Sequence, residues 1–281
     1  MIILLSAADI LQVCAEAGTI RKGETPLAGR KYGLDLGTMN IRIFQGGHGL
    51  VVYEKNMIAI QRKKEVAAIG NDAFEMYERT PASIVISNPV RDGVIADINN
   101  MNKVAEALLK KCGCTTGFMR NNSFYLAVPS DVTEVEKRAY FDLIAHSAYN
   151  THNIFVVEKP LAAALGENVD VKSKKGMMIV DMGAGTTEIT VITMGGIVVS
   201  KLLKMGGNTI NASICQLVKE RHHLVIGDKT AEYLKLELGH AIPGQGRGKT
   251  VFGRDVITGL PSKAEVSDHL VFDAMKNYLF Q

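Results

Sequence analysis

Apolar and polar positions along the chain form the same short pattern twice. Residues 31–34 and 177–180 are mainly apolar runs of strand length, each followed at once by an aspartate and a glycine-rich turn. A second strand-like run comes after each turn, at residues 41–44 and 188–192. Short apolar runs bounded by glycine are typical of buried strands. The pattern therefore predicts two strand–turn–strand units, one in each half of the chain.

Strands followed by helices make up the remainder of both halves. The first half has strand patterns at 50–53, 123–128 and 154–157 and helix patterns at 99–112, 133–148 and 161–165. Thr133, with Glu136 three residues later, predicts a capping box at one helix start. After residue 176 the order begins again, with a strand at 197–203 and a helix at 209–222. This repetition favours a duplicated α/β domain with a ligand between the copies.

The same pattern suggests where the domains begin and end. We expect an N-terminal extension and linker at 1–30, a first domain at 31–155 and a second domain at 156–281. Short mixed segments broken by glycine and proline predict a small inserted subdomain at about 56–95. A second insertion is expected at about 205–265. At 281 residues the chain is long enough for two modest cores.

The two glycine turns carry the candidate chemistry. The first is GLDLGT at 33–38 and the second is IVDMGAGTTE at 179–188. Glycine lets backbone N–H groups crowd around an anion, and an adjacent carboxylate can hold a divalent cation, usually through water. One such loop is weak evidence because aspartate and glycine dominate ordinary hairpin turns. Two in matching contexts predict a clamp for one polyphosphate.

Composition narrows the classes of protein to which the chain can belong. An apolar fraction of 47% with a mean hydropathy of +0.09 indicates a soluble globular protein, and a net charge of +3 is too small to indicate nucleic acid as a partner. Residues 1–18 are too short and too polar to span a bilayer and lack the basic start of a signal peptide. Four scattered cysteines without a secretory signal favour a reduced cytoplasm.

Longer stretches make the chain similar to one family. They are RTPASIV (79–85), RDGVIADI (91–98), AVPSDVTEVEKRA (127–139), PLAAALG (160–166), IGDKTAEYLKLELG (226–239) and GRDVITGLP (253–261). Through these and the two loops, the chain resembles the MreB family of bacterial actins, the rod shape-determining proteins, over about residues 31–275. The resemblance implies an α/β, actin-like fold: two ribonuclease-H-like domains with inserted subdomains around a nucleotide cleft that holds ATP and magnesium.

The resemblance also implies roles for individual residues. Asp35 and Asp181 would face the phosphates and hold magnesium, mainly through water. The first phosphate loop would comprise Gly37, Thr38, Met39 and Asn40, and the second Gly183, Ala184, Gly185 and Thr186. The adenosine side would be contacted by Glu232, Tyr233, Leu234 and Lys235 on a helix of the second half.

A membrane element and partners follow from the same resemblance. Family members dock on the inner membrane through a hydrophobic loop, and Phe118 and Met119, beside Arg120, occupy that place here. Two apolar residues insert weakly, so polymer avidity would have to strengthen the attachment. The expected partners are other subunits of a filament, the inner membrane surface and membrane-bound cell-wall elongation proteins. The expected location is the cytoplasm, peripheral to the inner face of the bacterial cell membrane.

Two departures from the family pattern change the expected activity. Lys159 stands where the family has the glutamate that orients the attacking water, and Glu158 occupies the neighbouring position. An ammonium cannot accept a proton from water, so we expect slow or absent ATP hydrolysis. The chain also stops at Gln281, within the helix after the second insertion, which predicts a second domain that is incomplete at its C-terminal end.

Three functions compete at this point. The first is an ATP-binding filament that follows the membrane and positions cell-wall synthesis to maintain rod shape. The second is a non-hydrolysing, truncated paralogue that caps filaments or acts as an interaction module. A sugar or acetate kinase of the same superfamily is disfavoured by the family-specific stretches at 127–139 and 253–261.

Overall fold

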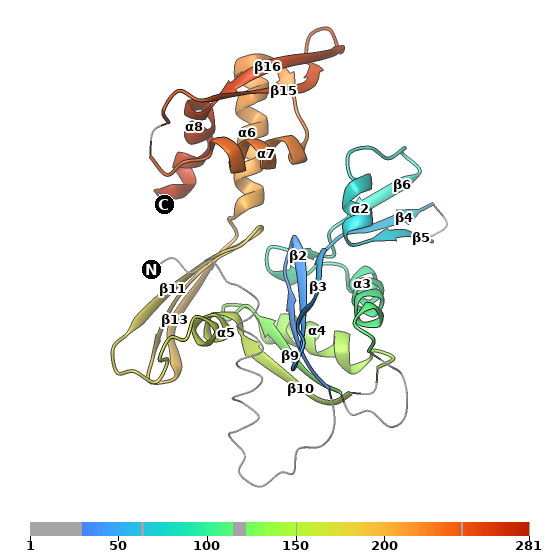
Figure 1. Ribbon diagram of the computed structural model, residues 1–281, viewed down its shortest axis with the longest axis vertical. Coiled ribbons are helices and arrows are strands. Elements are labelled where there is room, and N and C mark those ends of the chain that lie inside the picture. Colours follow the sequence, from blue (N-terminus) through green and yellow to red (C-terminus); the bar gives the residue numbers. More distant parts are fainter. Residues whose placement is uncertain (1–29, 63–64, 115–121, 150, 243, 281) are drawn as a thin grey trace. The chain divides into compact units, whose positions relative to one another are not determined.

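The computed structural model describes residues 30–62, 65–114, 122–149, 151–242 and 244–280. They form two compact units, one ending at Lys204 and the other beginning at Met205 (Figure 1). The candidate membrane residues Phe118 and Met119, and the extension at residues 1–29, lie outside the described ranges. In the part of the chain that is described, no helix is long and apolar enough to cross a membrane.

A five-stranded sheet organises the first unit. Its strands are β1 (Lys31–Leu36), β2 (Asn40–Gln45), β3 (Gly49–Lys55), β9 (Asn122–Val128) and β10 (Thr151–Glu158), in the order β10-β9-β1-β2-β3. The first three strands form an antiparallel meander, whereas β9 and β10 run parallel to β1. The domain boundary predicted after residue 155 falls inside β10 and stays a prediction.

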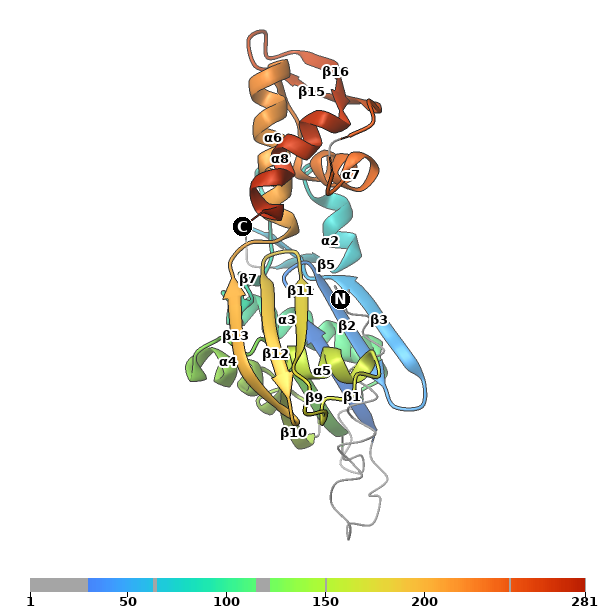
Figure 2. The same cartoon turned by 90° about the vertical axis from the view of Figure 1, so that its left-hand side faces the viewer.

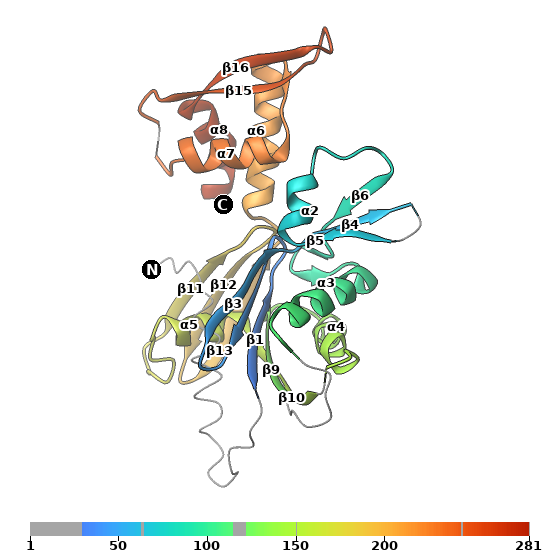
Figure 3. The same ribbon diagram turned by 45° about the vertical axis from the view of Figure 1, so that its right-hand side comes forward.

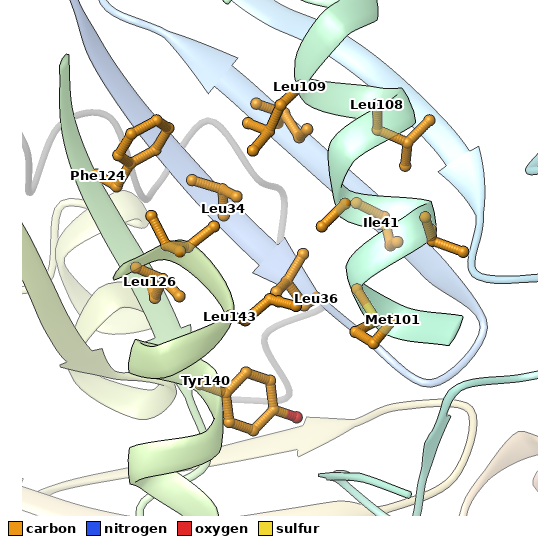
Figure 4. Packing of buried hydrophobic residues seen from close by; sticks show 14 of the residues in the cluster. Leu34, Leu36, Ile41, Met101, Leu108, Leu109, Phe124, Leu126, Tyr140 and Leu143 are labelled. Carbon is orange, nitrogen blue, oxygen red and sulfur yellow. The ribbon is translucent and has the colours of Figure 1, made fainter. Parts of the chain in front are cut away.

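Both faces of this sheet are covered, which explains the apolar run in β9. Phe124 and Leu126 point into the main core under α3 (Ile98–Lys111) and α4 (Glu134–Ala145), and Tyr125 and Ala127 belong to a second cluster beside Ala162. Figure 4 shows the main core, with Leu108 and Leu109 of α3 and Tyr140 and Leu143 of α4 facing the strands. The alternation of side chains along β9 therefore determines which residues pack in the core on each face of the sheet.

A second sheet repeats the meander of the first. It contains β11 (Met177–Met182), β12 (Thr187–Thr193) and β13 (Gly196–Leu203), all antiparallel. Helix α5 (Lys159–Gly166) packs against both sheets, with Ala162 in the cluster of β9 and with Ala163 and Ala164 beside Ile179 and Ile192 (Figure 3). The small alanine side chains allow this close approach and hold the two meanders in one compact unit.

The predicted insertion at about 56–95 contains short elements. They are β4 (Ile58–Gln61), β5 (Val66–Ile69), α2 (Asn71–Met76), β6 (Ile84–Ser87), β7 (Val90–Arg91) and β8 (Val94–Ile95). Strands β5, β4 and β6 make a small sheet, and β7 pairs with β8. A separate apolar cluster, including Met57 and Ala73, holds this part together and also takes in Met39 from the first glycine turn.

The second unit has its own core. Its elements are α6 (Gly207–His222), β14 (Leu224–Val225), α7 (Asp228–Leu238), β15 (Gly248–Asp255), β16 (Pro261–Ser267) and α8 (Asp268–Leu279). Strands β14, β15 and β16 form a three-stranded sheet that packs with the three helices, as Figure 2 shows. Asp268 is fully buried and accepts hydrogen bonds from the backbone N–H groups of Gln245, Gly246 and Arg247, which fixes the segment before β15.

Local signals in the sequence explain where several elements begin. The Thr133 hydroxyl accepts from the Glu136 N–H and the Glu136 carboxylate accepts from the Thr133 N–H, so the predicted capping box is confirmed. Pro160 stands in the first turn of α5, where its missing N–H costs nothing. The strand predictions at 41–44, 123–128 and 197–203 are also confirmed within a residue or two at their ends.

Candidate functional site

The two glycine turns have the same backbone structure. In the first, the Gly37 N–H donates to the Asn40 carbonyl at 3.1 Å, and in the second the Gly183 N–H donates to the Thr186 carbonyl at 2.8 Å. Each turn closes an antiparallel hairpin, β1–β2 or β11–β12. The chain therefore forms two strand–turn–strand units whose turns are closed by the same hydrogen bond, as the sequence pattern predicts.

The two turns lie against each other. A Cβ atom added to Gly185 would stand 2.9 Å from the Thr38 hydroxyl, so only glycine allows this approach. Met39 of the first turn is buried in an apolar cluster that Ala184 of the second turn also contacts. Ala184 is not among the described residues with a positive φ angle, so its backbone conformation is one that alanine adopts without strain.

Backbone N–H groups of both turns are available to an anion. Within the described part of the chain, the N–H groups of Thr38, Met39, Ala184 and Gly185 make no hydrogen bond to protein. Successive N–H groups of this kind in a glycine turn form the concave donor sets that bind phosphate in proteins. The candidate site thus has two such donor sets side by side.

A cavity of about 210 Å³ lies at these turns. Its lining comprises Asp35, Leu36, Gly37, Thr38, Met39, Asn40, Arg42, Gly93, Ala127, Pro129, Tyr140, Lys159, Asp181, Met182, Gly183, Ala184, Gly185, Thr186 and Glu188. All residues predicted for the two phosphate loops are in this lining, together with both candidate metal aspartates. The sequence reasoning did not single out Arg42, Tyr140 or Glu188.

Two asparagines from the inserted segment support the first turn. The Asn56 amide donates to the Gly37 carbonyl at 2.8 Å, and the Asn56 N–H donates to the Met39 carbonyl at 2.8 Å. The Asn88 amide donates to the carbonyls of Thr38 and Asn56 at 3.2 and 3.1 Å. These bonds occupy the carbonyl oxygens of Gly37, Thr38 and Met39 and hold the turn in place.

Asp35 is held between two cations. Its Oδ1 atom lies 2.9 Å from the Lys159 ammonium and its Oδ2 atom accepts from Arg42 at 3.1 Å. Burial alone would raise the pKa of the Asp35 carboxyl, but the charges of Lys159 and Arg42 outweigh it and hold that pKa below its usual range. Arg42 comes directly opposite Asp35 in the hairpin register, so the same short turn that makes the loop also makes this pair.

Asp181 has a contrasting environment. The residue opposite it in the second hairpin is Glu188, a buried carboxylate. Burial raises the pKa of Asp181, and the carboxylates of Asp35 and Glu188 add to the shift against the opposing charge of Lys159. Glu188 is held in place by the Ser130 N–H, which donates to it at 2.8 Å, and by the Ser130 hydroxyl. The two hairpins therefore share the same turn hydrogen bond but differ in charge, because Asp35 is opposite a cation and Asp181 is opposite another carboxylate.

Lys159 and Tyr140 are two further polar residues that line the cavity. Burial would lower the pKa of the Lys159 ammonium, but the carboxylates of Asp35 and Asp181 raise it above the usual lysine value. Burial raises the pKa of the Tyr140 phenol, whose hydroxyl donates to the Gly93 carbonyl at 2.9 Å. Lys159 is therefore an ammonium and Tyr140 a neutral donor at physiological pH.

The other predicted site residues lie elsewhere. Glu158 is the last residue of β10 and, among the described residues, is not part of the cavity lining. The predicted adenosine contacts are on α7 in the second unit, where Leu234 is fully buried in the core and the Lys235 ammonium donates to the Gly207 carbonyl. Their contact with a nucleotide stays a prediction.

Comparison with known proteins identifies the family. The model of the MreB/Mbl protein family matches residues 29–281. The chain belongs to the MreB/Mbl family. It is 34% identical to the cell shape-determining protein Mbl of Bacillus cereus over 249 residues, covering 88% of this chain and 74% of that protein. It is 36% identical to the cell shape-determining protein MreB of Escherichia coli over 255 residues, covering 88% and 72% respectively.

Solved structures agree with this assignment. MreB5 of Spiroplasma citri, crystallised with AMPPNP, is 30% identical to this MreB/Mbl chain with a TM-score of 0.84, covering 90% of the chain and 75% of MreB5. The MamK double helical filament, at 20% identity and a TM-score of 0.73, supports the fold alone. The predicted actin-like fold is thus confirmed.

Proposed function

We propose that this MreB/Mbl protein binds ATP with its polyphosphate between the two glycine turns. The observation that carries the proposal is the pairing of two turns with the same closing hydrogen bond and with free N–H groups, both lining one cavity. Single glycine turns are common and structural, whereas two that line one cavity can present backbone N–H groups to the phosphates of a single ligand from both turns. The MreB5 structures of Spiroplasma citri with AMPPNP and with ADP support nucleotide as the ligand class.

Rod-shape maintenance through filament formation is the cellular role that we propose. The Mbl and MreB relatives are named cell shape-determining proteins, and MamK, a more distant protein of the same fold, forms a double helical filament. In this proposal nucleotide binding gates assembly, and the filament lies in the cytoplasm on the inner face of the cell membrane, where it positions membrane-bound cell-wall elongation proteins. Attachment would use Phe118 and Met119, and rests on the family resemblance.

Magnesium fits the site poorly at Asp35. A hard divalent cation is bound by free carboxylate oxygens or through water, and both oxygens of Asp35 already contact cations at 2.9 and 3.1 Å. Asp181 keeps its carboxylate free of such a partner in the described chain, but burial raises the pKa of that group and so disfavours its charge. Of the two aspartates predicted to hold magnesium, only Asp181 remains a candidate. The proposed binding of ATP by the two turns does not require the ion.

The second candidate function, a non-hydrolysing form, is favoured by Lys159. A residue that orients and deprotonates the attacking water must accept a proton, and the Lys159 ammonium has no lone pair with which to accept one. Glu158 does not line the cavity in the described structure, so it is not positioned to take over the role. The protein should therefore bind ATP and release phosphate slowly, which would make nucleotide occupancy, rather than turnover, the signal for assembly.

Calorimetric titration of the whole chain with ATP tests nucleotide binding. The variants Gly37→Ala and Gly185→Ala put a Cβ atom 2.8 Å from the Asn40 carbonyl oxygen and 2.9 Å from the Thr38 hydroxyl, distorting one turn each. Gly196→Ala is the matched control, because no atom lies within 4 Å of its added Cβ. We expect each turn variant to weaken binding at least about tenfold, equivalent to about 1.4 kcal/mol, and the control to bind like the parent. Binding that neither turn variant changes would refute the two-turn site.

A further inference from the structure

The position of Lys159 suggests a use beyond the loss of hydrolysis. Lys159 is the first residue of α5, and its side chain crosses into the cavity, where the ammonium lies 2.9 Å from Asp35 Oδ1. The side chain keeps 20% of its surface exposed, and the ammonium also interacts electrostatically with Asp181. The Lys159 ammonium thus pairs with Asp35 and lines the same cavity as Asp181, the two carboxylates that were expected to share a metal ion.

Charge at the cavity is set by five side chains. Arg42 and Lys159 are cations, and Asp35, Asp181 and Glu188 are acids, so the ionised lining has a net charge of minus one. Asp35 is neutralised on both oxygens by the two cations. A divalent cation placed at Asp35 would either displace Lys159 or stand close to its ammonium, and like charges in a partly buried site repel strongly.

We propose that the Lys159 ammonium is a built-in counter-ion for the nucleotide polyphosphate and takes the place of a divalent cation in this protein. The inference deepens the proposed function and rests on it. An ammonium has three N–H donors and no acceptor. The ammonium forms an ion pair with Asp35, and its N–H donors can also reach phosphate oxygens presented by the turns. Asp35 then acts as a positioning residue, because it holds the ammonium in the cavity, and Arg42 fixes Asp35 through the other carboxylate oxygen.

This arrangement has a specific binding signature. A phosphate–lysine contact is a point-charge interaction that needs no added ion, so affinity for ATP should be the same with and without divalent metal. A site that relies on magnesium shows the opposite behaviour, because the ion neutralises the phosphates and bridges them to the protein. The ammonium offers no open coordination position and activates no water, in agreement with slow phosphate release.

The experiment compares ATP affinity of the whole chain in excess Mg²⁺ and in excess EDTA. Lys159→Met removes the charge and keeps the length of the side chain, and Lys201→Met, at an exposed lysine of β13, is the matched control. We expect the parent and the control to bind ATP within a factor of about three in the two buffers, and Lys159→Met to lose at least about tenfold in EDTA. Magnesium should restore part of the affinity of Lys159→Met, since removing the ammonium frees the Oδ1 atom of Asp35 while Arg42 still holds Oδ2.

The outcomes separate this inference from the proposed function. Parent protein that binds ATP in Mg²⁺ and not in EDTA overturns the counter-ion role and leaves the nucleotide site intact. Equal binding by the parent and Lys159→Met in EDTA overturns the role as well. No binding of ATP in either buffer overturns the proposed function itself. The parent titration needs no variant, so the conclusion stands even if Lys159→Met fails to fold.

Discussion

The ion pair between Lys159 and Asp35 should be measurable as an interaction energy in the apo protein. The perturbation is a double-mutant cycle of Lys159→Met, Asp35→Asn and the two together. Both substitutions keep the approximate size of the side chain, so the cycle reports mainly on charge. Lys201→Met serves as a surface control for the loss of a lysine.

The expected magnitude follows from the distances and exposure. Two unit charges 2.9 Å apart attract by about 6 kcal/mol at an effective dielectric constant of about 20, and desolvation of the two groups offsets most of this. Breaking a fully buried pair costs about 3–5 kcal/mol, but the two side chains here keep 20% and 11% of their exposure. We therefore expect about 2 kcal/mol for Lys159→Met and about 3 kcal/mol for Asp35→Asn, which also leaves Arg42 unpaired. The double variant should cost about 3 kcal/mol, giving a coupling of about 2 kcal/mol.

Urea unfolding followed by tyrosine fluorescence is a suitable assay. The chain has no tryptophan, and six of its eight tyrosines belong to the first unit, so the signal reports on the unit that contains the pair. The folded-state pKa of Asp35 is lowered, so its stabilisation is present at neutral pH and is lost as the pH falls through that lowered value, below about 4. Additive costs near 5 kcal/mol in the double variant, or a cycle without pH dependence, would refute the pairing.

Three further predictions concern the surroundings of this pair. Asp181→Asn should stabilise the apo protein at pH 7, because burial raises the folded-state pKa of Asp181. The increase in urea midpoint should disappear as the pH falls below the ordinary carboxyl range, because the Asp181 carboxyl of the parent is then protonated in both the folded and the unfolded state. Asn56→Ala should lower the free energy of unfolding by about 1–3 kcal/mol, since it leaves the Gly37 carbonyl without its donor; an unchanged urea midpoint would contradict this support role. Tyr140→Phe should cost about 1–2 kcal/mol through the lost hydrogen bond to Gly93 and keep ATP affinity within about threefold, as a calorimetric titration would show.

The sequence was sufficient for features that depend on neighbouring residues. Apolar runs bounded by glycine predicted both hairpins, because strand and turn signals lie within about ten residues of each other. Thr133 and Glu136 predicted a helix start for the same reason. The Asp35–Arg42 pair is also a local feature that the sequence could have predicted, since a four-residue turn after Leu36 places Arg42 opposite Asp35.

Features that depend on long-range packing could not be predicted in this way. Asn56 and Asn88 support the first turn from positions 19 and 50 residues away from the groups that they bind, and nothing local marks either asparagine as part of the site. The burial of Met39 in the cluster of the inserted segment likewise required the fold. Lys159 was predicted to change the chemistry, but its contact with Asp35 depends on how α5 packs between the two sheets.

A crystal structure of the whole chain with AMPPNP is the most direct test of the central claim, that both glycine turns grip one polyphosphate. We expect phosphate oxygens within hydrogen-bond distance of N–H groups in both turns, at Thr38 or Met39 and at Ala184 or Gly185, with the Lys159 ammonium against the same phosphates. Phosphates that contact one turn alone, or a nucleotide bound away from the cavity, would contradict it.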